Sequence, residues 1–516
     1  MKHLHIEEET TNHDKELANK TIVKAHVVVD KDEKKNSGRH NLNKFLKPKN
    51  SKGYNPSSSN SKAKNKECYN CHKIGHFAKD CHQLKHGSDK KKDSLMNLEL
   101  VWFKELYKTD GFSVDIIHRD SPLSPFYNHS ATQAELAEAA LLRSTARINH
   151  FRQSSTYGTK IQSVVIGGDG EYLMKLSVGS PPAEGFAILD TGSDLVWVQC
   201  EECIKCHPQN GTRFDPAKSS TYKNVSCYSE LCQALSPGEC GRKRENECEY
   251  EYGYEDGTNT VGILATDTCT FDSSDGQVAT FPDSVFGCGL KQGGEWESSS
   301  SGLLGLGSGP LSRVSQLGAQ IEHKFSYCLL PSSVNSTSNF RFGKDAVITG
   351  EGVVSTPILS KLDPSFYFLN LEGVTIGDKR FANKQAGPGE GKIIIDSGTT
   401  FNYFHSKLHY NLKAAVKKHM GLKPVPHPPT DFRLCYNTIA FSEVPEMTTV
   451  FHFTGADVTL KNINIFMEID NITCLGMLHA GDDVAIYGVF AQMNFQVAYD
   501  LQRKLVSFAP ADGTKS

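Results

Sequence analysis

The sequence predicts an all-β body of two related lobes, which follows a basic leader of a different character. Three observations support this prediction. After about residue 164 the chain becomes a series of short alternating segments separated by Gly, Pro, Asn and Ser. Within that body one carboxylate motif occurs twice in matching apolar surroundings. At 516 residues, the chain is long enough for more than one folded unit.

The leader differs from the body in charge. Residues 1–92 hold 21 Lys and Arg against 11 Asp and Glu, a net charge of about +10. The whole chain carries −3, so residues 93–516 carry about −13. A basic leader suits a polyanionic partner. Residues 1–66 are predicted to be disordered, because their Lys-, Asn- and Ser-rich composition offers little apolar surface to bury.

The fifteen cysteines fall into two groups. Three stand close together within residues 67–83, and the other twelve lie between Cys200 and Cys474. Twelve cysteines spread through a Gly-rich strand body predict disulfides and an oxidising compartment, and a zinc or redox role for them is the less favoured alternative. The polar first 24 residues contain no apolar core of a secretion signal, which conflicts with that compartment. No apolar run of about 18 residues occurs, so no membrane partner is expected.

The strongest helix prediction covers residues 132–152. Leu136, Ala139, Ala140, Arg143 and Arg147 recur there at helical spacing. The strand predictions for the body begin with Tyr172–Val178, and a similar strand, Phe366–Leu371, precedes the second carboxylate motif.

The carboxylate motifs occupy Phe186–Ser193 and Lys392–Thr399. Each consists of an apolar run followed by Asp-[Thr/Ser]-Gly-[Ser/Thr]. Their aspartates, Asp190 and Asp396, stand 396 − 190 = 206 positions apart, which fits two related domains. A single copy would most simply be an ordinary turn, but two copies in matched frames argue against that reading.

Each motif is expected to place a carboxylate at the end of a buried strand. If the two turns meet, the like charges compete, so one carboxyl keeps a proton while the other is ionised. Such a pair supplies a base for water and an acid for the peptide carbonyl or leaving amine, with no catalytic cofactor. The predicted catalytic residues are Asp190 and Asp396, supported by loop residues Thr191, Gly192, Ser193, Ser397, Gly398 and Thr399.

A different motif lies at residues 67–83. Three thiolates and one imidazole at short spacing predict one structural, tetrahedral zinc ion. Two aromatic residues beside them, Tyr69 and Phe77, are positioned to stack on bases, and nearby lysines supply positive charge. This segment resembles the zinc knuckle of retroviral and retrotransposon nucleocapsid proteins, which implies binding of single-stranded nucleic acid. The predicted zinc ligands are Cys68, Cys71, His76 and Cys81.

From residue 111 to the end, the chain resembles the pepsin-like aspartic proteases, and within them the nepenthesin-type plant branch. The resemblance implies a bilobal all-β endopeptidase that acts on proteins or peptides, monomeric and located in the apoplast or vacuole. The motifs that carry it are Glu171–Met174, Asp190–Cys200, Phe286–Gly289, Gly302–Gly307, Phe325–Cys328 and Ile395–Thr399.

The resemblance also implies a domain plan. A linker at 84–110 precedes a propeptide-like segment at 111–165, and the lobes cover 166–350 and 351–516 with a Cys-rich insertion at 200–248. The propeptide's basic residues, Arg143, Arg147 and Arg152, would cover an acidic cleft until a maturation cut near 160–170. A hairpin flap would carry Tyr254, with Tyr252 as the alternative, and Trp197 would support that tyrosine; plain core packing is the competing explanation for these aromatic residues.

Family pairing implies five disulfides and two thiols. Cys328 is expected to lack the family's partner cysteine, and Cys269 stands where an apolar residue is usual. Val489 departs from the Asn that relatives usually carry. The implied pairs are Cys200–Cys203, Cys206–Cys288, Cys227–Cys248, Cys232–Cys240 and Cys435–Cys474.

Two function classes therefore remain open: an acid endopeptidase made as a zymogen, and a nucleic-acid-binding protein with an inert protease body. A knuckle needs reduced thiols and the protease needs disulfides, so we interpret the chain as a fusion of a retrotransposon-like leader with a protease. A retroviral-type protease is excluded, because those carry one such motif per chain and dimerise. Sequons at Asn128, Asn210, Asn224, Asn335 and Asn471 are glycosylation candidates only in a secreted chain.

Overall fold

The computed structural model describes residues 111–156, 172–235, 239–240, 246–253, 259–293, 299–359, 363–383, 391–428, 432–438, 441–481 and 484–511. Contacts divide the chain into Met1–Lys90 and Lys91–Ser516, and all described residues belong to the second unit. The predicted disordered segment 1–66, the knuckle 67–83 and the linker 84–110 lie outside the described residues.

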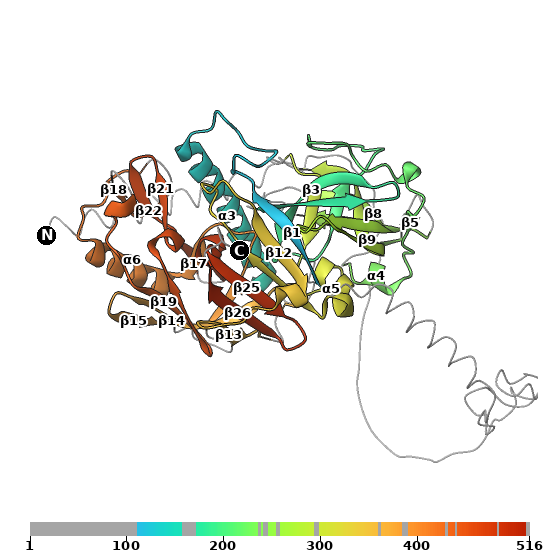
Figure 1. The fold of residues 1–516 in the computed structure, drawn as a ribbon. Coiled ribbons are helices and arrows are strands. Elements are labelled where there is room, and N and C mark those ends of the chain that lie inside the picture. Colours follow the sequence, from blue (N-terminus) through green and yellow to red (C-terminus); the bar gives the residue numbers. More distant parts are fainter. Residues whose placement is uncertain are drawn as a thin grey trace, which may run out of the picture. The chain divides into compact units, whose positions relative to one another are not determined.

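The described part of the chain is mostly β, as predicted (Figure 1). Its largest sheet has 15 strands among the described residues and runs from the N-terminal lobe to the last strands of the chain. In sheet order the strands are β13 (Val354–Pro357), β26 (Leu505–Pro510), β25 (Phe495–Asp500), β11 (Lys324–Cys328), β12 (Ser338–Gly343), β1 (Gly111–His118), β2 (Tyr172–Val178), β3 (Ala183–Asp190), β10 (Gly302–Gly305), β4 (Trp197–Gln199), β9 (Val278–Gly293), β8 (Asn259–Asp272), β7 (Cys248–Gly253) and β6 (Glu239–Cys240), with β5 (Lys223–Asn224) paired to β8.

The C-terminal lobe has two sheets among its described residues. The larger has eight strands: β20 (Ala456–Leu460), β19 (Thr449–Phe453), β14 (Phe368–Ile376), β16 (Lys392–Ile395), β24 (Ala485–Tyr487), β17 (Asn402–His405) and β23 (Met477–Gly481), with β15 (Lys379–Ala382) paired to β14. The smaller joins β18 (Cys435–Asn437), β22 (Ile472–Leu475) and β21 (Phe466–Ile469).

Two longer helices accompany the sheets. α3 (Gln133–Thr156) begins where the sequence predicts a helix and runs a few residues further than expected. Thr132 starts it with a capping box: its hydroxyl accepts from the Glu135 amide, and the Glu135 carboxylate accepts from the Thr132 amide. α6 (Ser406–Met420) packs on the C-terminal lobe. The short helices are α4 (Glu230–Gln233), α5 (Arg313–Leu317), α7 (Val489–Gln492), η2 (Pro216–Lys218), η3 (Gly318–Ile321), η4 (Lys344–Ala346), η5 (Phe441–Glu443) and η6 (Asn462–Asn464).

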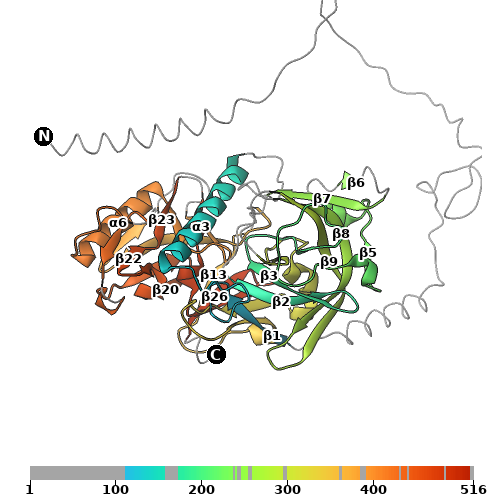
Figure 2. The ribbon, with the colours of Figure 1, turned by 90° about the horizontal axis from the view of Figure 1, so that it is seen from above.

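The propeptide-like segment is built into this fold at two places. Strand β1 pairs with β12 on one side and with β2 on the other, so it lies inside the large sheet. Its Phe112 is buried and stacks on Phe342, with ring centroids 4.6 Å apart. Helix α3 lies between the orange C-terminal elements and the green N-terminal ones in Figure 2. Buried residues of β1 and α3 therefore contribute to the core of this fold.

The disulfides correct most of the implied pairing. The predicted Cys435–Cys474 bridge is confirmed: the two residues lie opposite each other on β18 and β22. The other four implied pairs are wrong, because strand pairing brings different cysteines together. Cys200 directly follows β4, which pairs with β9, and Cys288 on β9 is 5.5 Å away between Cα atoms. The bridges found are Cys200–Cys288, Cys203–Cys206 and Cys232–Cys248, and Cys227 is also disulfide-bonded.

Cys269 and Cys328 are buried thiols outside any disulfide among the described residues, as the sequence predicts. None of the described helices combines the length and the apolar character that a membrane span requires.

Candidate active site

The two predicted aspartates lie close together, so that one nitrogen of Arg147 donates to both. Asp190 ends β3, whose parallel neighbour is β10, and Asp396 directly follows β16, whose parallel neighbour is β24. Both aspartates have no exposed surface. The repeated sequence pattern thus folds into a repeated structural one, in which an apolar strand leads to a buried carboxyl group.

Reciprocal hydrogen bonds join the two loops. The Thr191 amide donates to the Ser397 hydroxyl at 3.1 Å, and the Ser397 amide donates to the Thr191 hydroxyl at 2.9 Å. This symmetric pair of bonds holds the loops of the two lobes against each other, at the positions that the sequence assigns to loop support.

Each carboxyl is also held from within its own loop. The Gly192 amide donates to Asp190 Oδ1 at 3.0 Å, and the Gly398 amide donates to Asp396 Oδ1 at 2.9 Å. A Cβ atom on Gly398 would lie 2.7 Å from Asp190 Oδ1, so only glycine lets the loops approach this closely. The hydroxyls of Ser193 and Thr399 donate to the Oδ2 atoms of the same two carboxyl groups.

A guanidinium group from helix α3 lies between the carboxyls. Arg147 Nε donates to Asp396 Oδ2 at 2.5 Å, and Nη2 donates to Asp396 Oδ1 at 2.9 Å and to Asp190 Oδ1. Its side chain is 3% exposed. Burial alone would lower the pKa of Arg147, but the charges of Asp190 and Asp396 and their hydrogen bonds raise it above its ordinary value. Arg147 therefore stays charged and occupies the space between the two acids.

Of the other predicted propeptide arginines, the structure describes only the side chain of Arg143, which contacts a carboxyl group outside the dyad. Arg143 lies 3.9 Å from Asp120, and the side chain of Arg152 lies outside the described residues. One turn before Arg147, Ser144 accepts a hydrogen bond from the Thr400 amide at 3.1 Å. Further apolar residues of α3, Ala137, Ala140, Leu141 and Ile148, pack with Phe401, Tyr403, Phe432 and Leu478 of the C-terminal lobe.

Of the two flap candidates, only Tyr252 lies within the described residues. Tyr254 lies outside the described residues, in the segment 254–258 that follows β7. The alternative, Tyr252, is buried on β7 and belongs to the same apolar cluster as Trp197 on β4.

Sequence reasoning missed two polar residues beside the dyad. Gln492 on α7 donates to the Asp396 carbonyl oxygen at 3.1 Å and accepts from the Tyr327 hydroxyl at 2.5 Å. Asp194, two positions after Gly192, is another buried carboxyl, and burial raises its pKa to about 6. A signal for Asp194 was present, because an acid within an apolar Leu-Val-Trp frame is unusual.

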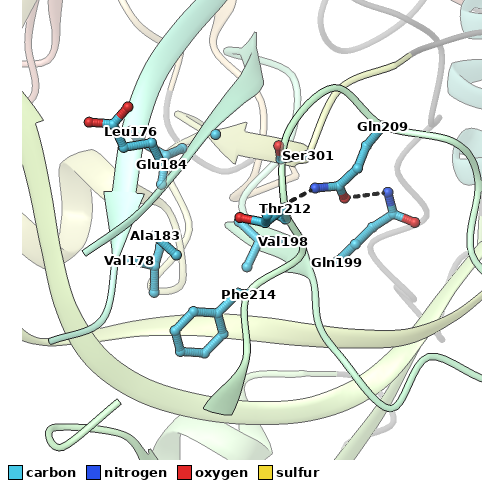
Figure 3. A pocket seen from close by; sticks show the side chains of 11 residues that line it. Leu176, Val178, Ala183, Glu184, Val198, Gln199, Gln209, Thr212, Phe214 and Ser301 are labelled. Carbon is cyan, nitrogen blue, oxygen red and sulfur yellow. Dashed lines mark hydrogen bonds between the residues drawn. The ribbon is translucent and has the colours of Figure 1, made fainter. Parts of the chain in front are cut away.

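A small pocket on the N-terminal lobe is separate from this centre (Figure 3). Gln199 donates to Gln209 at 2.7 Å, and Gln209 donates to the Thr212 carbonyl oxygen at 3.1 Å. Phe214 and Ser301 also line the pocket, and no residue of either aspartate loop does. The pocket therefore adds nothing to the dyad.

Known protein families match the two halves of the body separately. Residues 172–344 match the family model described as xylanase inhibitor N-terminal, and residues 366–510 match the one described as xylanase inhibitor C-terminal. The solved structures of edgp and of basic 7S globulin from soybean are each 18% identical, with TM-scores of 0.56 and 0.54; they cover 79% and 68% of this chain, and 96% and 95% of their own chains. At that identity they support the fold alone.

Curated relatives are much closer in sequence. A probable aspartic protease of Arabidopsis thaliana is 43% identical over 422 residues, covering 78% of this chain and 94% of that protein. Aspartic proteinase nepenthesin-1 of Nepenthes gracilis is 36% identical over 413 residues, covering 78% of this chain and 91% of that protein. The chain therefore belongs to the plant aspartic protease family that includes the nepenthesins.

Proposed function

We propose that the protein is an aspartic endopeptidase made as a zymogen, whose catalytic pair is Asp190 and Asp396. The observation that supports the catalytic role is the meeting of two fully buried carboxyls, each held by its own loop amide and hydroxyl. Synthesis as a zymogen is supported by the position of Arg147, which lies between the two carboxyl groups.

In the matured enzyme a water molecule would take the place of the guanidinium group. The ionised carboxyl would accept a proton from that water, and the protonated one would donate to the peptide carbonyl oxygen. The water oxygen then attacks the carbonyl carbon and gives a tetrahedral diol. As the C–N bond breaks, the carboxyl that took the proton of the water gives it to the leaving amine, and a hydroxyl of the diol returns a proton to the other carboxyl. The loop amides and hydroxyls keep both carboxyls oriented throughout.

Activation follows from the same geometry. Ion pairs between a guanidinium group and carboxylates weaken in acid, so the attraction between α3 and the cleft is expected to weaken as pH falls. The released segment, residues 111–165, would then be cut near 160–170. The disulfides of the body favour an oxidising compartment such as the secretory pathway.

Substitution of either aspartate tests the catalytic role. Asp190→Asn and Asp396→Asn in the matured protein should each abolish peptide hydrolysis in acid, because both carboxyls are needed to activate water. Pepstatin should inhibit the unsubstituted enzyme, and EDTA should not. Residual hydrolysis by Asp396→Asn, or inhibition by EDTA, would rule out this mechanism.

A second function is proposed for the leader on the strength of its sequence alone. Cys68, Cys71, His76 and Cys81 have the residue types and spacing of a closed zinc site, with Tyr69 and Phe77 beside them. We propose that this segment binds one zinc ion and single-stranded nucleic acid. The competing proposal, that the protease body is inert and only the leader acts, is decided by the hydrolysis assay.

A further inference from the structure

Asp194 lies in the same loop as the catalytic Asp190, but its carboxyl has hydrogen-bond partners different from those of the dyad. Its carboxyl accepts two hydrogen bonds, from the Gly309 amide to Oδ1 at 2.9 Å and from the Ser365 hydroxyl to Oδ2 at 2.6 Å. Gly309 belongs to the N-terminal lobe, in the loop after β10. Ser365 belongs to the segment that enters β14 of the C-terminal lobe. The carboxyl of Asp194 thus bridges the two lobes.

Two bonds of Ser308 also join these two segments, and a third bond holds the Ser365 segment itself. The Ser308 amide donates to the Ser365 carbonyl oxygen at 3.2 Å, and the Ser308 hydroxyl donates to the Pro364 carbonyl oxygen. The Ser365 amide donates to Asp363 Oδ1 at 2.9 Å. Among the residues that join these segments, Asp194 also belongs to the loop of Asp190, so it connects that loop to the contact between the lobes.

The carboxyl of Asp194 has little space around it. A Cβ atom on Gly309 would lie 2.6 Å from Asp194 Cγ, and one on Gly307 would overlap Asp194 Oδ1. Asp194 is 6% exposed. A charged carboxylate here would have to rely on its two protein donors for solvation, which costs free energy in a buried site.

Its electrostatic surroundings also disfavour a charge. Burial raises the pKa of Asp194 to about 6, against the donors Ser365 and Gly309, and the nearby carboxyls of Asp363 and Asp190 raise it further. Tyr367 is a further titratable neighbour: burial raises its pKa, and the charges of Tyr499 and Asp194 raise it further. In acid the carboxyl therefore carries a proton, which it can donate to the Ser365 oxygen while Oδ1 still accepts from Gly309.

We propose that Asp194 is a positioning residue of the active site, whose protonated carboxyl ties the Asp190 loop to the C-terminal lobe under acidic conditions. This inference rests on the proposed endopeptidase function only in calling the loop catalytic. Above the pKa the bridge holds a buried charge and weakens. The enzyme then has a lobe junction that is most stable at the acidic pH where the dyad would work.

Protonation of Asp194 makes the stability of the fold depend on pH. The pKa of Asp194 is raised from 3.8 to about 6 on folding, so the stabilising contribution is complete at low pH and is lost as pH rises from about 4 through about 6. About two pKa units correspond to roughly a hundredfold change in the unfolding equilibrium constant.

The test compares the full chain with its Asp194→Asn variant. Asparagine keeps an oxygen for Gly309 and offers an NH₂ donor to Ser365, so it imitates the protonated acid at every pH. Between pH 4 and pH 8, urea unfolding of the unsubstituted chain should become roughly a hundredfold more favourable relative to the variant, with the two chains equal near pH 4. Parallel stability curves would overturn the proposal.

Ser365→Ala keeps the inference testable if Asp194→Asn does not fold. It removes one donor to the carboxylate, so the pH at which stability is lost should rise; an unchanged midpoint would overturn the proposal. These readouts need no hydrolysis, so they stand even if the chain proves inactive. In an active enzyme, the ratio of kcat/KM for Asp194→Asn to that of the unsubstituted chain should rise from pH 4 to pH 7, whereas a merely structural defect would shift it equally at every pH.

Discussion

The contribution of Arg147 to holding the precursor inactive can be measured with a single substitution. Arg147→Met in the precursor removes a buried cation from between two carboxylates, and breaking such a pair costs roughly 3–5 kcal/mol. We expect the variant precursor to mature at a higher pH and faster than the unsubstituted one, measured by the appearance of the shorter chain on gels.

Arg143→Met is the matched control for that experiment. Arg143 lies on the same helix but pairs with Asp120 at 3.9 Å instead of with the dyad. It should change maturation far less. Equal effects of the two substitutions would mean that general loosening of α3, and not release of the dyad, controls activation.

His409 on α6 is expected to lower the stability of the fold in acid. Burial lowers its pKa to about 4, and the nearby His479 and Lys413 lower it further. A histidine with a depressed pKa stays neutral in the fold, so stability is lost as pH falls from about 6.5 through about 4, by at most about 3 kcal/mol. His409→Gln should remove that loss in urea unfolding curves, whereas His427→Gln, at an exposed position, should not. If both variants behaved like the unsubstituted chain, another group would set the limit.

At the residue level, the sequence identified the dyad because the same short pattern occurs twice in it. It did not identify Arg147 over Arg143 or Arg152, since only the placement of α3 decides which arginine meets the carboxyls. Asp194 was missed because its significance depends on Ser365, which lies 171 positions away along the chain.

Among the elements, strand β1 is the part of the propeptide-like segment whose contribution to stability is easiest to test. Phe112 is 6% exposed and lies against Phe271, Phe281 and Phe342. Phe112→Ala should lower the free energy of unfolding of the precursor by about 3–5 kcal/mol, because it leaves a cavity in a packed aromatic cluster. Urea unfolding measures this directly.

The control for the β1 experiment is Leu123→Ala, at a position that is 44% exposed, where a small change is expected. A matured protein that lacks 111–165 should have the same stability whichever precursor it came from. If Phe112→Ala left the precursor's stability unchanged, β1 would be a weakly held strand and the sheet would not depend on it.

The element-level predictions failed where three-dimensional pairing decides. Strand and helix positions follow local patterns, and α3 and β2 were found at their predicted places. Disulfide partners do not follow sequence order: Cys232 bonds to Cys248, on β7, rather than to the nearer Cys240. Several cysteines within a short span allow many pairings, and the sequence alone does not choose among them.

For the whole molecule, the expected boundary near residue 350 does not separate the sheets. Strands β25 and β26, from the end of the chain, join β11 in the large sheet. Strands from both lobes therefore form one continuous sheet. A sequence repeat reveals two related halves, but the exchange of strands between them depends on contacts more than 160 positions apart.

The last prediction separates the leader from the protease. In the full chain, removal of zinc with EDTA should abolish binding to single-stranded RNA while leaving acid hydrolysis unchanged, because the dyad chemistry proposed here uses only carboxyls. Tyr69→Ala and Phe77→Ala should each weaken RNA binding by about 1–3 kcal/mol if the rings stack on bases. Lys24→Ala, distant in sequence from the knuckle, is the matched control and should have a much smaller effect. Binding measured at several salt concentrations should weaken steeply as salt rises. RNA affinity that survived both EDTA and Cys71→Ser would show that the lysines act alone, and the zinc site would then have no part in recognition.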